Sequence, residues 1–331
     1  MSSQPPIAPA MMLNIFTTIA GDLQRVEATI EEALVTDVPL LQEVSTHLLH
    51  AGGKRIRPAL LLLTAKFPGV PLERVLPVAA AVELIHMASL VHDDVVDESR
   101  VRRGRPTVNA QWSNQISVLT GDYLFAKAFA MLAQTGNTRV VEIMANTVYE
   151  ISKGELAQIA SYFDVAQTEA DYYERIAQKT GYLLAECCRL GGVIAGVEEE
   201  QIQALFDYGM GVGLSFQIAD DLLDFHGSAK TVGKPVGGDL KLGILTLPVI
   251  YALANSADSE ELRAIILTRA VGDQQVERAK EILAACGAFD YARQQADHHL
   301  AQGQAALDRV PDLETREALK DLAHFVINRS F

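Results

Sequence analysis

The chain has 331 residues, of which 49% are apolar and 21% are charged, and its formal net charge is −14. This length allows one large domain or two, and the composition is that of a globular protein with a large core. The acidic balance argues against non-specific binding of nucleic acid. The cysteines at 187, 188 and 286 have no zinc-ligand spacing and fit buried residues in a reducing compartment. No basic segment opens the N-terminus, so we expect no signal peptide and a cytoplasmic location.

The predicted elements are helices along nearly the whole chain, because apolar residues recur at helical spacing and Ala, Leu, Glu and Gln are abundant. About ten to thirteen helices with short connections are expected. We expect one all-α domain over residues 1–331, with residues 1–12 loosely ordered. The apolar stretch 76–91 contains Glu83 and His86, which favours a core helix over a membrane span. Breaks are predicted at 52–53, 68–71, 104–106, 136–137, 191–192 and 233–243.

The first segment with chemical character is Gly52-Gly53-Lys54-Arg55-Ile56-Arg57-Pro58. The two glycines allow the backbone to approach a ligand closely. Pro58 fits the first turn of a new helix, whose free N–H groups favour an anion. The spacing is not that of a Walker loop, and an ordinary exposed basic turn is the alternative interpretation.

An aspartate motif follows at 93–97, and a second copy lies at 220–224, both of the form Asp-Asp-x-x-Asp within apolar, helix-like stretches. Residues four apart share a helix face, so Asp93 and Asp97 point the same way, as do Asp220 and Asp224. The alternative is a pair of solvated acidic faces. Because acids in such apolar helices are costly unless paired or bound to metal, we favour divalent cations that bridge to a diphosphate.

Basic and polar residues accompany both motifs. Arginines at 100, 102, 103 and 105 follow the first motif, where the sequence predicts a helix end and a guanidinium cluster that binds phosphate, although cations also favour a helix C-terminus. His86 lies two turns before Asp93, and Gln217 lies three residues before Asp220. Lys179-Thr180 lies in an apolar helix, and Lys234 lies in a glycine-rich loop that could close over a site.

In these motifs the chain resembles the trans-type polyprenyl diphosphate synthases over almost its full length. The matching segments are 52–58, His86, 93–97 with 102–104, Gly121-Asp122-Tyr123-Leu124, 179–180, 216–224, 233–234 and 238–240. The resemblance implies an all-α bundle around a central deep cavity. It also implies a Mg²⁺-dependent prenyltransferase, commonly homodimeric, that condenses isopentenyl diphosphate with an allylic diphosphate (farnesyl or geranyl).

The resemblance also implies residue roles. Isopentenyl diphosphate would be bound by Lys54, Arg57, His86 and Arg103. The allylic diphosphate would be bound by Arg102, Lys179, Gln217 and Lys234, and Thr180, next to Lys179, would also bind substrate. Mg²⁺, with three ions when substrate is bound, would be ligated by Asp93, Asp97 and Asp220 and supported by Asp94, Asp221 and Asp224. The residues expected to carry catalysis are Asp93, Asp97, Lys179, Gln217, Asp220 and Lys234. One departure is Ile244, where the family often has lysine.

Product length is read from the turn before the first motif, where Ala88 and Ser89 are small. Aromatic residues there would close the bottom of the pocket, whereas these small residues leave it open. We therefore expect a long-chain product of about seven to nine isoprene units, with octaprenyl favoured. Phe125 and Phe129 are candidates for a deeper floor and are equally well read as core. A geranylgeranyl-length product is an alternative, as is a non-catalytic subunit of a heteromeric synthase. A terpene cyclase or head-to-head condensing enzyme is a further alternative, which the basic segment at 52–58 disfavours.

Overall fold

The structure, a computed structural model, describes residues 9–226 and 237–328. These residues are almost entirely helical, and they form two compact units. Unit 1 combines residues up to 148 with 186–203 and 311–321, and unit 2 combines 149–185 with 204–310 and the C-terminal residues from 322. The all-α class predicted from the sequence is confirmed, and the single domain stays a prediction.

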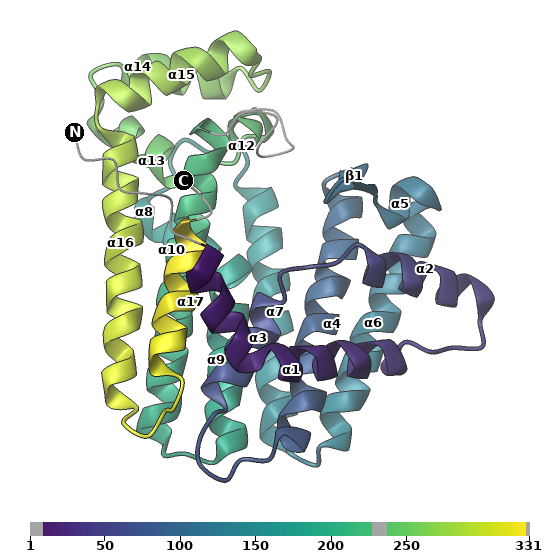
Figure 1. Ribbon diagram of the computed structural model, residues 1–331. Coiled ribbons are helices and arrows are strands. Elements are labelled where there is room, and N and C mark those ends of the chain that lie inside the picture. The colour runs from purple at the N-terminus through teal and green to yellow at the C-terminus, as the bar shows by residue number, and fades with distance from the viewer. Residues whose placement is uncertain (1–8, 227–236, 329–331) are drawn as a thin grey trace. The chain divides into compact units, whose positions relative to one another are not determined.

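Unit 1 is built around the pair α4 and α6, which run side by side (Figure 1). Helix α4 is apolar on nearly every face, as expected of a helix that is buried all round. Helices α1 and α3 pack on α4, while α5 and a short hairpin lie at the end of α4 (Figure 1). The elements of this unit are α1 (Pro9–Ala33), α2 (Pro39–His50), α3 (Ile56–Thr64), α4 (Leu72–Val96), β1 (Val101–Arg102), β2 (Arg105–Pro106), α5 (Val108–Gln111) and α6 (Asn114–Gln134).

Four further helices have their residues divided between the two units, namely α7 (Thr138–Ala160), α9 (Tyr182–Ala195), α10 (Glu199–His226) and α17 (Arg316–Asn328). Unit 2 alone contains α8 (Glu169–Ile176), the π-helical turn η1 (Ala177–Gly181), α12 (Gly238–Leu242), α13 (Leu247–Asn255), α14 (Ser259–Leu267), α15 (Asp273–Ala285), α16 (Ala288–Ala306) and the 3₁₀ turn η2 (Leu307–Arg309). Its core includes Tyr172, Ile218, Leu222 and Phe225, which come from α8 and α10. This packing fixes the second aspartate motif against α8.

The described residues contain more α-helical segments than the ten to thirteen expected, because several are single turns, such as α5 and α12. Residues 9–12 belong to the first turn of α1. Residues 1–8 of the segment expected to be loosely ordered lie outside the described residues.

The predicted break at Gly191-Gly192 is wrong, because both residues lie inside α9. A Cβ atom on Gly191 would come within 2.2 Å of Thr64 Oγ1 and 2.6 Å of the Thr64 carbonyl carbon. The glycine therefore serves close packing of α9 on α3. The break falls at Gly196, which has a φ of +71°.

Among the described residues, two helices, α4 and α6, are long and apolar enough to cross a membrane when only length and composition are considered. In α4, 72% of the most apolar window is buried within the protein, which fits the core helix predicted from the sequence. In α6 only 39% of the window is buried. Much of the apolar surface of α6 is therefore uncovered in a single copy of the chain.

Candidate active site

The first aspartate motif lies at the C-terminal end of α4, where Asp97 is the cap residue and its N–H donates to the Asp93 carbonyl oxygen at 2.8 Å. Asp93 is half-buried and Asp97 is exposed, whereas Asp94 is buried. The shared face of Asp93 and Asp97 predicted from their spacing is compatible with this helix. Their carboxylates are the accessible ones of this motif.

Asp94 instead binds the protein itself. Its Oδ1 accepts a hydrogen bond from Arg102 Nε at 2.8 Å, and its backbone oxygen accepts one from Asn109 Nδ2 at 2.9 Å. The ion pair is half-sheltered, since the Arg102 side chain is 36% exposed and that of Asp94 is 7% exposed. Asp94 therefore holds the segment after α4 in place.

That segment is a β-hairpin, which corrects the expectation that the helix runs up to the arginine cluster. Helix α4 ends at Val96, and Arg102 pairs with Arg105 across the hairpin. The two loop residues, Arg103 and Gly104, have φ values of +52° and +75°. Positive φ at both positions is what a two-residue hairpin turn of type I′ requires. The turn lets the Arg103 side chain reach the α2–α3 loop.

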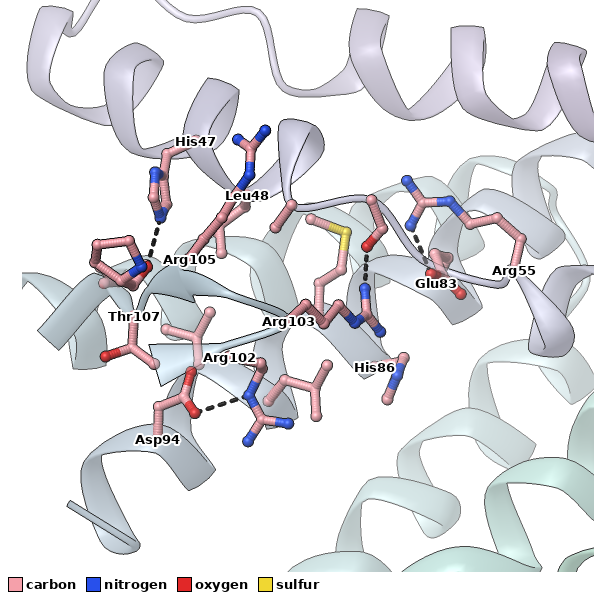
Figure 2. A pocket seen from close by; sticks show the side chains of 17 residues that line it. His47, Leu48, Arg55, Glu83, His86, Asp94, Arg102, Arg103, Arg105 and Thr107 are labelled. Atoms are coloured by element: carbon pink, nitrogen blue, oxygen red, sulfur yellow. Dashed lines mark hydrogen bonds and ion pairs between the residues drawn. The ribbon is translucent and has the colours of Figure 1, made fainter. Parts of the chain in front are cut away.

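A pocket in unit 1 lies between α2, α4 and this hairpin, and it brings several of the predicted residues together (Figure 2). Arg103 Nη1 donates to the Gly52 carbonyl oxygen, which links the hairpin to the glycine-rich loop. A Cβ atom on Gly53 would lie 2.9 Å from the same Arg103 nitrogen, so the glycine leaves room for the guanidinium group in this position. The polar and charged residues that line the pocket are His47, Arg55, Glu83, His86, Asp94, Arg102, Arg103, Arg105 and Thr107.

Buried Glu83 is an acid within this basic pocket. Its Oε1 lies 2.7 Å from Arg55 Nη1, and the two side chains are 5% and 10% exposed. Arg55 Nε also lies 3.3 Å from Glu27 Oε1. Arg55 therefore forms ion pairs with two carboxylates, which stabilise the α2–α3 loop. Sequence analysis gave neither Arg55 nor Glu83 a role, although an acid in the apolar run before His86 was a signal for one.

The electrostatics of the pocket favour an anion. Burial lowers the pKa of His86 well below its usual value, and the nearby positive charges of Arg57, Arg103, Arg102 and Arg55 lower it further. Burial also lowers the pKa of Arg103, although Glu83 opposes this shift. A neutral imidazole among several guanidinium groups can donate a hydrogen bond to a phosphate oxygen without adding to the repulsion between cations.

Two other predicted ligands for isopentenyl diphosphate, Lys54 and Arg57, do not line this pocket. Lys54 is exposed and is not among the residues that line this pocket, and neither is Arg57. Arg57 lies in the first turn of α3, which begins at Ile56, and the predicted place of Pro58 in the first turn of a helix is confirmed. The pocket therefore contains His86 and Arg103 of the predicted set.

In unit 2, Lys179 and Thr180 lie in the π-helical turn between α8 and α9. Single π-turns inside helices are frequent at functional sites because they change the direction of side chains within one turn. Lys179 Nζ lies 2.8 Å from Glu155 Oε1 and 3.4 Å from Gln158 Oε1. Thr180 Oγ1 donates to Gln217 Oε1 at 2.7 Å. The structure thus brings together two residues that were predicted to bind substrate.

The second aspartate motif, like the first, combines an accessible aspartate with a buried one. Asp220 is exposed, and Asp221 is buried. Burial raises the pKa of Asp221 to about 6, and the neighbouring charge of Asp220 acts in the same direction. Hydrogen bonds from Tyr172 and Gln217 lower this pKa and limit the shift. Asp221 is held by these two donors, which sequence analysis did not link to it.

Asp224 contacts the backbone that follows the motif. Its Oδ1 accepts from the Gly238 N–H at 3.0 Å, and its Oδ2 accepts from the Asp239 N–H at 3.1 Å. These are free N–H groups at the start of α12, which a carboxylate satisfies well. Asp224 therefore anchors α12. Lys234, another predicted ligand, lies outside the described residues.

The residues proposed to set product length differ in exposure. Ala88 is fully buried, while Ser89 is half-buried and its Oγ donates to the His86 carbonyl oxygen at 2.9 Å. Phe125 and Phe129 on α6 are both half-buried, and the Phe125 ring lies 5.8 Å from that of His92. Ser89 is on the stripe that leads to Asp93, whereas Ala88 faces the core.

The donor sets fit a magnesium site of the kind that substrate completes. Within residues 9–226 and 237–328, no group of three or more His, Cys, Asp or Glu side chains is close enough to hold a metal alone. Mg²⁺ is usually held by one or two carboxylates together with water and substrate phosphates, so such a group is not required. The accessible carboxylates of Asp93 and Asp97 in unit 1, and that of Asp220 in unit 2, are each suitable oxygen donors.

An all-α fold with an aspartate-rich helix end beside a basic pocket defines the class of isoprenoid synthases. The family model for polyprenyl synthetase matches residues 38–284. Heptaprenyl diphosphate synthase component 2 of Geobacillus stearothermophilus is 42% identical over 96% of this chain and 98% of that protein. Octaprenyl diphosphate synthase of Escherichia coli is 37% identical over 94% of this chain and 96% of that protein.

Among solved structures, a decaprenyl diphosphate synthase from Rhodobacter capsulatus matches with a TM-score of 0.90 at 41% identity, covering 96% of this chain and 99% of that one. The chain belongs to the polyprenyl synthetase family, and it is a prenyltransferase of isoprenoid biosynthesis. Use of a divalent metal ion is general to this family.

Proposed function

We propose that the protein condenses isopentenyl diphosphate with an allylic diphosphate, head to tail, to make an all-trans polyprenyl diphosphate of about seven to nine isoprene units, with octaprenyl favoured. The observation that carries the proposal is the basic pocket at the C-terminal end of α4, next to the accessible carboxylates of the first motif. The relatives named for heptaprenyl, octaprenyl and decaprenyl products support a long chain.

In this proposal, basic and polar residues bind the two diphosphates, and aspartates hold the metal ions. Arg103 and His86 bind the diphosphate of isopentenyl diphosphate and place its double bond for attack. Lys179, Thr180, Gln217 and Lys234 bind the allylic diphosphate. Bound Mg²⁺, with three ions when substrate is present, would neutralise the departing diphosphate as its C–O bond breaks. Asp93, Asp97 and Asp220 would hold the metal, with Asp94, Asp221 and Asp224 fixing the surrounding backbone and side chains.

Catalysis in this proposal is electrostatic, and no covalent nucleophile is needed. The diphosphate leaves the allylic substrate with the bonding electron pair, and the double bond of isopentenyl diphosphate attacks the allylic cation that results. A proton is then lost to restore a double bond. The released diphosphate is the base that takes this proton. The small side chain of Ser89 leaves room for the growing chain.

The proposed assembly is a homodimer that uses α6. Val118 and Leu119 on this helix are 42% and 68% exposed, and Ala126 and Ala130 continue the exposed stripe. An exposed apolar stripe at helical spacing is suited to a second helix of the same kind. The alternative is a heteromeric synthase, which is favoured by one observation: the Geobacillus relative is named as component 2.

One assay tests the function and the alternative together. Purified protein is mixed with isopentenyl and farnesyl diphosphates, with and without Mg²⁺, and products are separated by chain length. We expect a Mg²⁺-dependent ladder that ends near octaprenyl diphosphate. A ladder that stops at geranylgeranyl diphosphate would replace the product assignment, and an inactive homogeneous sample would favour the heteromeric alternative.

A further inference from the structure

Tyr172 on α8 is fully buried in the core of unit 2, yet its hydroxyl donates to Asp221 Oδ2 at 2.7 Å. Burial raises the pKa of Tyr172 well above its usual value, so the phenol keeps its proton and is a donor. A buried polar pair of this kind is maintained only when both members are satisfied. Tyr172 is therefore a fixed partner of the second aspartate motif.

The other carboxylate oxygen of Asp221 links the pair to the predicted diphosphate ligands. Asp221 Oδ1 accepts from Gln217 Nε2 at 2.8 Å, and Gln217 Oε1 accepts from Thr180 Oγ1 at 2.7 Å. An ionised carboxylate only accepts, so the amide nitrogen of Gln217 must face Asp221 and its oxygen must face Thr180. The carboxylate thus selects one of the two orientations of the Gln217 amide.

Arg175 fixes the Tyr172 ring from the other side. Its guanidinium carbon lies 5.5 Å from the ring centroid, its Nη1 donates to Gln167 Oε1 at 2.6 Å, and its Nη2 donates to the Leu245 carbonyl oxygen at 2.5 Å. The Arg175 side chain is buried, so its guanidinium is fixed where it packs on the ring. The cation therefore supports the position of the ring and of its hydroxyl.

We propose that Tyr172 is a positioning residue for the allylic diphosphate subsite, with Arg175 as its support. This inference rests on the proposed function, which places Gln217 and Thr180 against that diphosphate. Without the Tyr172 hydroxyl, Asp221 Oδ2 would be left buried with one donor fewer. The carboxylate would then rotate or admit water, and the Gln217 amide would lose its fixed orientation.

The chain supplies a matched control in the next residue. The Tyr173 hydroxyl donates to Gln295 Oε1 at 3.3 Å, and the side chain is half-buried. Y172F and Y173F each remove one hydrogen-bonded hydroxyl from the same helix and leave the ring in place. Only Y172F removes a donor to Asp221.

The first measurement needs no turnover. Melting temperatures of the full-length protein are recorded without ligand, to confirm folding, and then with Mg²⁺ and inorganic pyrophosphate, whose affinity is measured by calorimetry. We expect Y172F to bind pyrophosphate at least fivefold more weakly than wild type, and Y173F to stay within twofold. Equal affinity of wild type and Y172F would overturn the proposal. Absence of binding by wild type would instead reject the proposed function.

Steady-state kinetics and a double-mutant cycle separate positioning from simple loss of stability. We expect Y172F to raise the KM for farnesyl diphosphate at least fivefold and to change the KM for isopentenyl diphosphate less than twofold. T180V removes the hydroxyl at the other end of the chain of hydrogen bonds, and its effect should be less than additive with Y172F. If Y172F fails to fold, R175K carries the test, because it keeps the charge but loses the contacts to Gln167 and Leu245 that hold the Tyr172 ring. An unchanged allylic KM in R175K would then overturn the proposal.

Discussion

Glu83 and Arg55 form a largely buried ion pair, with 2.7 Å between Oε1 and Nη1, beneath the glycine-rich loop of the basic pocket. Glu83 also acts electrostatically on Arg57 and Arg103, so one acid balances several cations. Buried pairs are costly to break, since the remaining charge loses its partner. The pair therefore fixes the loop that the Arg103 side chain reaches.

We predict that E83Q weakens the binding of isopentenyl diphosphate, with a KM increase of roughly tenfold, equivalent to about 1.4 kcal/mol. The KM for the allylic diphosphate should change little. E27Q is the control, because Glu27 is 49% exposed and pairs with the same arginine at 3.3 Å, where an ion pair contributes little. Tighter binding by E83Q would contradict this prediction, since it would mean that Glu83 only reduces the positive potential.

His86 should make stability depend on pH. Its pKa in the folded protein is well below its usual value, so below about pH 6.5 the unfolded chain binds a proton that the folded protein excludes. The free energy of unfolding should therefore fall as the pH decreases below about 6.5, by up to about 1.4 kcal/mol per pH unit from this group. H86Q should lose this part of the slope in denaturant unfolding between pH 5 and 7. Identical slopes for wild type and H86Q would contradict this prediction, because they would show that folding does not change the pKa of His86.

Substitutions of Asp220 and Asp224, the first and last residues of the second motif, should affect activity and stability differently. Asp220 is exposed and proposed as a metal ligand, so D220A should lower kcat by about a hundredfold or more and leave the melting temperature nearly unchanged. Asp224 accepts from two N–H groups at the start of α12, so D224A should cost about 1–2 kcal/mol of stability, like the loss of a helix cap. D224N, which keeps one acceptor oxygen, should recover part of that stability. Equal losses of kcat and stability in D220A and D224A would contradict these separate roles of Asp220 and Asp224.

The fold class, the helix that carries His86 with the first motif, and the start of a helix near Pro58 could all be predicted from the sequence. These features depend on local periodicity and capping, which are written into consecutive residues. The end of α4 and the roles of Asp94 and Asp221 could not be predicted, because they depend on Arg102 and Tyr172, which lie 8 and 49 residues away. Within one motif, identical aspartates thus differ in role according to partners that their spacing does not reveal.

Gly191 shows the same limit, because a glycine that permits close packing looks in sequence like one that ends a helix. G191A should be strongly destabilising, by about 3 kcal/mol or more, since its Cβ atom would overlap the Thr64 backbone. G21A in α1 is the matched control, because nothing lies within 4 Å of a Cβ atom there. G21A should stabilise the protein by about 0.5–1 kcal/mol. Chemical denaturation measures both values, and a neutral G191A would contradict the packing role.

Ser89 and Ala88 should respond differently to the same bulky residue, although both are small and adjacent. Ser89 is half-buried on the stripe that leads to Asp93, so S89F should block the path of the growing chain and shorten the product. Ala88 is fully buried, so A88F should overpack the core and cost about 1–3 kcal/mol of stability. Chromatography of the products and a melting curve distinguish the two effects. An unchanged product ladder in S89F would refute the assignment of Ser89 to the chain-length pocket, because a phenylalanine on that stripe leaves the chain no room beside α4.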